Sequence, residues 1–118
     1  MLNLDDLKKD TKLINAINWE MTPEEAIRLY LEWGNNWTRG NYVIRSKNDV
    51  AHYFAISTWK NPPIIYLIRR NSEEAVDLAE ITMPDDLKEH FLESIGHNKG
   101  VYTLTDKVRD WLKSELNA

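Results

Sequence analysis

The chain has 118 residues, no cysteine and a formal net charge of −4. This length predicts a single domain, residues 1–118, which would bury about two-thirds of its unfolded surface and so needs no stabilising metal or disulfide. The hydrophobic content of 42% and charged content of 29% exclude a wholly disordered or fibrous chain. The lack of cysteine excludes disulfides, thiolate metal sites and cysteine nucleophiles.

Neither the beginning of the chain nor its apolar runs predict a membrane or secreted location. Asp5 and Asp6 contradict the positively charged start of a signal peptide. The longest apolar run, residues 62–68, is far shorter than the roughly 20 residues that span a bilayer. We therefore expect a cytoplasmic protein that does not contact membranes.

Charge is segregated along the chain. Residues 36–71 contain six Lys or Arg and one Asp, a net charge of +5, whereas residues 1–35 and 72–118 carry −3 and −6. The basic middle also holds six of the twelve aromatic residues. Such an acidic–basic–acidic order indicates that the middle segment has a role that the two flanks do not share.

The first half of the chain predicts two helices and the start of a sheet. Apolar residues at three- and four-residue spacing predict a helix over 3–17. Thr22 and Pro23 are typical cap and first-turn residues for a second helix over 23–33. A short strand is expected at 42–45, followed by strands at 54–58 and 64–70 that pair as a hairpin.

The second half predicts three more helices and one strand. Ser72 is expected to cap a helix over 73–80, and Pro84 to begin another that ends near Ile95. A brief strand at 101–104 precedes a last helix that Thr105 would cap. The expected fold is α+β, with a small, mostly antiparallel sheet of three to four strands packed with about five helices.

Most catalytic and cofactor motifs are missing from the sequence. It has no glycine-rich phosphate loop, His-Glu-x-x-His motif, calcium loop or nucleophile elbow. We therefore assign no catalytic residue, metal ligand or cofactor. A general base with an orienting partner is conceivable only around Arg45, Asp49 and His52. A small enzyme with a pocket at Arg45 and His52 is thus an alternative.

The basic middle carries the candidate binding residues. Trp37 and Trp59 stand beside polar loop residues, where tryptophan near arginine is typical of an interaction hot spot. The competing interpretation, equally weighted, is that both rings cover a core edge. Neighbouring arginines at the end of a strand point to opposite faces, so one is expected to pair with Glu73, Glu74 or Asp77 while the other is left for a ligand. The favoured interpretation of this pair is nevertheless structural, with the acidic C-terminal region neutralising the basic strands internally. The predicted binding set is Trp37, Arg39, Arg45, Trp59, Arg69 and Arg70.

Several short stretches carry a family resemblance. They are residues 45–49, Tyr53-Phe54, Thr58-Trp59, Pro62-Pro63, residues 66–70, residues 100–102 and residues 111–113. Through them the chain, from about Thr22 onward, resembles small uncharacterised bacterial proteins of sulfate- and metal-reducing anaerobes. That resemblance implies a bacterial cytosolic setting and transfers no activity, cofactor or site residue.

Three functions fit these observations. The first is a non-enzymatic binding or regulatory module whose basic and aromatic sheet surface contacts an acidic protein partner. The second is single-stranded nucleic-acid binding by the same surface, which a sequence pI near 5.3 disfavours. The third is the small enzyme. A monomer and a homodimer are both compatible with a short sheet that leaves an edge.

Overall fold

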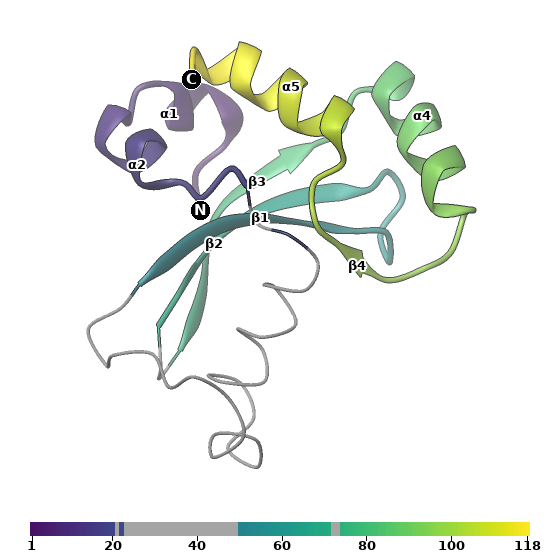
Figure 1. Cartoon of the computed structure of the whole chain (residues 1–118), viewed down its shortest axis with the longest axis horizontal. Coiled ribbons are helices and arrows are strands. Elements are labelled where there is room, and N and C mark those ends of the chain that lie inside the picture. Colours follow the sequence, from purple (N-terminus) through teal and green to yellow (C-terminus); the bar gives the residue numbers. More distant parts are fainter. Residues whose placement is uncertain (21, 23–49, 72–73) are drawn as a thin grey trace.

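The computed structural model describes residues 1–20, 22, 50–71 and 74–118, which form an α+β fold. The strands β1 (Ala51–Ser57), β2 (Ile64–Arg70), β3 (Ala75–Thr82) and β4 (Val101–Tyr102) make one antiparallel sheet in the order β3-β2-β1-β4. The helices α1 (Leu4–Lys8), α2 (Thr11–Ala16), α4 (Asp85–Ile95) and α5 (Asp106–Leu116) lie on one side of this sheet (Figure 1). The predicted fold class is confirmed. The helix predicted over 23–33 and the strand over 42–45 lie outside the described residues.

The strands β1 and β2 pair as the hairpin that the sequence predicts, although β1 begins at Ala51 and not at Phe54, and this hairpin forms the centre of the sheet. Its register pairs Phe54 with Leu67 and Ile56 with Ile65, so these four side chains share one face. All four are buried, with exposed fractions of 2% or less. The helices cover this face, and the register places Tyr53, Tyr66 and the residues that alternate with them on the opposite face.

The segment after β2 corrects a prediction, because residues 75–82 form strand β3 and not part of a helix over 73–80. The register between β2 and β3 shifts between Leu67 and Ile68, which marks a β-bulge. Leu78 is the extra residue at the bulge, so Val76, which pairs with Arg69, lies on the same face as Ala79 and Ile81, which pair with Leu67 and Ile65. The extra residue therefore gives the apolar residues of β3 a spacing of three and four, which is the pattern expected of a helix.

The N-terminal segment corrects a second prediction, because the helix expected over 3–17 is divided into α1 and α2. Asn3 caps the first helix by accepting a hydrogen bond from the Asp6 N–H at 2.8 Å. Asp10 then caps a new helix by accepting from the Leu13 N–H at 3.1 Å. A side chain that caps a helix leaves its own backbone outside helical geometry, so Asp10 breaks the run.

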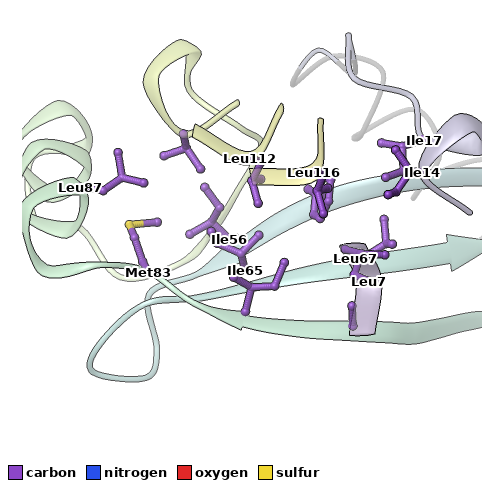
Figure 2. Close-up of a cluster of buried hydrophobic side chains, with 14 of the residues drawn as sticks. Leu7, Ile14, Ile17, Ile56, Ile65, Leu67, Met83, Leu87, Leu112 and Leu116 are labelled. Atoms are coloured by element: carbon purple, nitrogen blue, oxygen red, sulfur yellow. The ribbon is translucent and has the colours of Figure 1, made fainter. Parts of the chain in front are cut away.

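The core lies between the helices and the sheet. Figure 2 shows Leu7, Ile14, Leu112 and Leu116 of the helices directed toward Ile56, Ile65 and Leu67 of the sheet. Met83 and Leu87 fill the end of this layer beneath α4. The predicted helices after Pro84 and Thr105 are confirmed, and Gly96 ends α4 in the left-handed conformation at φ 72°.

Both ends of the sheet are tied to distant parts of the chain. Thr58, which is 1% exposed, follows β1, and its Oγ1 accepts a hydrogen bond from the Gly100 N–H at 2.8 Å. At the outer edge of β3, the Leu2 N–H donates to the Leu78 carbonyl at 2.9 Å, and the Leu2 carbonyl accepts from Glu80 at 2.9 Å. Among the described helices, none is long and apolar enough to traverse a bilayer.

Candidate functional site

The predicted binding residues that the structure describes lie in two separate places. Trp37, Arg39 and Arg45 lie outside the described residues. Trp59 follows the end of β1, where β2 begins at Ile64, whereas Arg69 and Arg70 are at the far end of β2. At about 3.3 Å per residue, the six steps from Ile64 to Arg70 separate the two places by about 20 Å. The structure thus does not bring Trp59 together with these two arginines.

The first place is an exposed surface at the turn end of the sheet. The side chain of Trp59 is 69% exposed, so its ring does not cover a core edge. Val101 is 66% exposed and lies close by, since Thr58 donates its N–H to the carbonyl of Gly100 at 2.9 Å. Lys60 extends over the ring of Tyr66, with its Nζ 5.9 Å from the ring centroid. We call Trp59, Lys60, Tyr66 and Val101 the Trp59 surface.

The charge on the Trp59 surface comes from Lys60. A side-chain hydrogen bond with Tyr66, followed by the charges of Tyr66 and Glu80, raises the pKa of Lys60 above its ordinary value. Its Nζ is 4.0 Å from Oε1 of Glu80, and the Lys60 side chain is 63% exposed. An ion pair this long and exposed contributes little stability. Lys60 is therefore a permanent cation that an incoming carboxylate can contact.

Arg69 and Arg70 point to opposite faces, as expected of neighbours on a strand. Nη2 of Arg69 is 3.9 Å from Oε1 of Glu74, which confirms that one arginine pairs with the acidic segment that follows. Arg70 donates from Nε to the Tyr53 hydroxyl at 3.3 Å. Within the described parts of the chain, Arg70 has no carboxylate partner.

The second place is a pocket of about 440 Å³ between α2 and the far end of the sheet. Its apolar wall consists of small and branched aliphatic side chains from the N-terminus, α2 and β3: Leu2, Leu13, Ala16 and Leu78. Its polar wall consists of four ionisable side chains: Asp10, Lys12, His52 and Arg69. The pairing of His52 with Arg69 across the hairpin explains why these two meet on the face that the helices cover.

The ionisable groups of the pocket are suited to binding. Burial, followed by the charge of Arg69, lowers the pKa of His52 below its ordinary value, so the imidazole is neutral at pH 7. Asp10 is already engaged in capping α2. Among the described residues that line the pocket there is no Ser, Thr or Cys side chain to act as a nucleophile. The alternative of an enzyme at Arg45 and His52 stays a prediction, because Arg45 lies outside the described residues.

Sequence reasoning missed this pocket, although it singled out two of its residues separately. The signal that joins them is the hairpin itself: pairing Ser57 with Ile64 also pairs His52 with Arg69. Lys12 could not be placed from the sequence, because only the packing of α2 against the sheet brings it there. No group of three His, Asp or Glu side chains in the described residues is arranged to hold a metal ion.

Comparisons with protein-family models, curated proteins and solved structures gave no match to this chain. The resemblance to small bacterial proteins therefore stays a prediction. The arguments for function below rest on the geometry of the described residues.

Proposed function

We propose that the chain is a cytoplasmic, non-enzymatic binding module that uses the Trp59 surface to contact an acidic protein partner. The observation that carries this proposal is the 69% exposure of Trp59 beside an exposed lysine. Tryptophan is enriched among the residues that dominate binding energy, because its large ring removes much apolar surface from water. Lys60 supplies the complementary charge for an acidic segment of the partner.

The neighbourhood of Trp59 favours a protein over a nucleic acid. Within the described residues, Lys60 is the one cation on the Trp59 surface, and Oε1 of Glu80 lies 4.0 Å from its Nζ. Binding to single strands combines stacking rings with a positively charged groove that follows the phosphates. A single lysine next to a carboxylate does not form such a groove, whereas a protein partner needs only a few charges around an apolar anchor.

Site-specific photo-crosslinking tests the proposal. A benzophenone amino acid replaces Val101, which is 66% exposed on the Trp59 surface, so that Trp59 itself stays in place. In a matched control it replaces Val50, which is 48% exposed and precedes β1 at the opposite end of that strand. Each variant is irradiated in a lysate of the cells that produce the protein. The proposal expects an acidic protein to be crosslinked at position 101 and not at position 50.

Three results would overturn the proposal. They are no adduct at position 101, equal adducts at both positions, and an adduct at position 101 that nuclease treatment removes. The last result would favour nucleic-acid binding. A homodimer would appear as an adduct of twice the mass of the chain, and sedimentation at micromolar concentration would then confirm or exclude it.

A further inference from the structure

We infer that the pocket between α2 and the sheet binds a small aliphatic carboxylate, with the hydrocarbon chain against its leucines and the carboxylate at Arg69 and Lys12. This site is separate from the Trp59 surface, and the inference does not rest on the proposed function. The argument uses the volume of the pocket, the division of its wall into apolar and charged parts, and the net charge of its lining.

The volume and the apolar wall indicate the body of the ligand. A volume of about 440 Å³ lies within the usual range for small-molecule sites. Leu2, Leu13 and Leu78 are each half-buried, so they present apolar surface that is only partly covered by the chain itself. Lys12 and Ala16 are exposed, so the pocket opens to solvent along α2. An aliphatic chain that enters there would remove the leucine surfaces from water.

The charged wall indicates the head group. Lys12 and Arg69 are cationic, Asp10 is anionic and His52 is neutral at pH 7, so the lining has a net charge of about +1 once a ligand displaces Glu74 from Arg69. A monoanion balances this charge, whereas a phosphate dianion would be left with excess negative charge near Asp10. The guanidinium of Arg69 has a planar fork of donors that matches a carboxylate in a bidentate manner.

Among the described residues, Glu74 engages the guanidinium of Arg69 only in part. Its Nη2 lies 3.9 Å from Oε1 of Glu74, which is near the outer limit for an ion pair and too long for a hydrogen bond. The Glu74 side chain is 60% exposed, so water screens its attraction for the guanidinium. Glu74 therefore acts as a weak internal competitor that a ligand carboxylate can displace.

A titration with four probes separates charge from apolar body. Octanoate has both features, octanol has only the chain, acetate has only the carboxylate, and octylamine has the chain with the opposite charge. Binding is followed by chemical-shift changes in ¹H–¹⁵N spectra of the whole chain. We expect octanoate to saturate in the millimolar range or below, by the usual efficiency of small ligands, and to shift the amides of Leu13, Leu78 and His52.

Two arginine variants provide a matched pair. Arg69→Gln removes the fork from the pocket, and we expect it to weaken octanoate binding about tenfold or more. Arg70→Gln removes the neighbouring arginine on the opposite face, and we expect it to change binding by less than about twofold. Glu74→Gln removes the competitor and is expected to tighten binding. The dispersed spectrum of each variant shows that it is folded.

Each unfavourable result contradicts the inference. Octanol or octylamine binding as tightly as octanoate would show that the carboxylate is not recognised. Equal losses in Arg69→Gln and Arg70→Gln would show that the site is elsewhere or that the effect is only one of net charge. If the chemical-shift changes do not saturate by about 10 mM octanoate, the pocket does not bind this class of ligand. If Arg69→Gln does not fold, Lys12→Gln replaces it as the test, because Lys12 is exposed.

Discussion

Replacing Thr58 by valine tests how the turn end of the sheet is fixed. Valine has the shape of threonine but neither donates nor accepts hydrogen bonds. In the native protein Oγ1 of Thr58 accepts from the Gly100 N–H at 2.8 Å, and its own proton lies within reach of the carbonyls of Gly100 at 3.1 Å and Asn98 at 3.2 Å. Thr58→Val leaves that N–H without its partner and removes the donor to the two carbonyls.

The expected cost follows from these bonds. A buried N–H left without an acceptor costs about 1–3 kcal/mol, and the added methyl group returns about 0.8 kcal/mol through burial. Since Gly100 is only half-buried, water recovers part of the loss. We expect the free energy of unfolding in urea to fall by roughly 0.5–2 kcal/mol with an unchanged slope.

A control variant and a measurement at a single backbone amide test this prediction. Thr82 is exposed at the end of β3, so Thr82→Val is expected to change stability by less than about 0.5 kcal/mol. In native-state hydrogen exchange, the amide of Gly100 should lose protection in Thr58→Val and keep it in Thr82→Val. A Thr58→Val protein as stable as the wild type, with a fully protected Gly100 amide, would refute the reasoning.

Two further predictions concern the N-terminal helices and the pH dependence of stability. Asp10→Ala removes the cap of α2 and is expected to lower the free energy of unfolding by about 0.5–2 kcal/mol. The control, Asp110→Ala, replaces an exposed aspartate and should have a smaller effect. Equal losses of stability in the two variants would contradict the capping role of Asp10. Because the pKa of His52 is lower in the folded than in the unfolded state, the unfolded chain binds more protons between these two values. Stability should therefore fall as the pH drops from about 6.5 through the folded pKa, and urea titrations of His52→Gln should show a weaker fall; an identical pH profile would count against this assignment.

The sequence predicts those elements whose apolar pattern agrees with their final environment. The strands of the central hairpin, Ala51–Ser57 and Ile64–Arg70, are rich in β-branched and aromatic residues, and the helices after Pro84 and Thr105 have clear start signals and one apolar stripe each. Local propensity and tertiary burial favour the same structure in these segments, so a reading of the sequence succeeds.

The errors arise where a long-range contact decides the structure. The apolar residues of β3 have helical spacing only because a bulge shifts the strand against β2, and the sequence of β3 alone does not reveal the bulge. Asp10 is a polar residue inside an apparently continuous helical pattern, yet it ends that pattern by capping α2. The extra residue at the bulge of β3 and the break at Asp10 are both hidden in the apolar periodicity on which the prediction depends.

The candidate sites could be predicted only in part from the sequence. Exposure of Trp59 and the ion pair of Arg69 follow from local rules about loops and strand faces. The separation of these residues follows as well, because the strand predicted over 64–70 places Trp59 and the two arginines at its opposite ends. The pocket could not be predicted from the sequence, because Lys12 lies near Arg69 and His52 only through the packing of α2 on the sheet.

The affinity of the crosslinked partner for purified variants tests the central claim most directly. If Trp59 anchors the interface, Trp59→Ala should raise the dissociation constant by about thirtyfold, the value that corresponds to a hot spot of about 2 kcal/mol. Val50→Ala, at an exposed apolar position away from the Trp59 surface, should leave it within about twofold. A Trp59→Ala protein that binds the partner as tightly as the wild type would contradict the claim that the Trp59 surface is the recognition site.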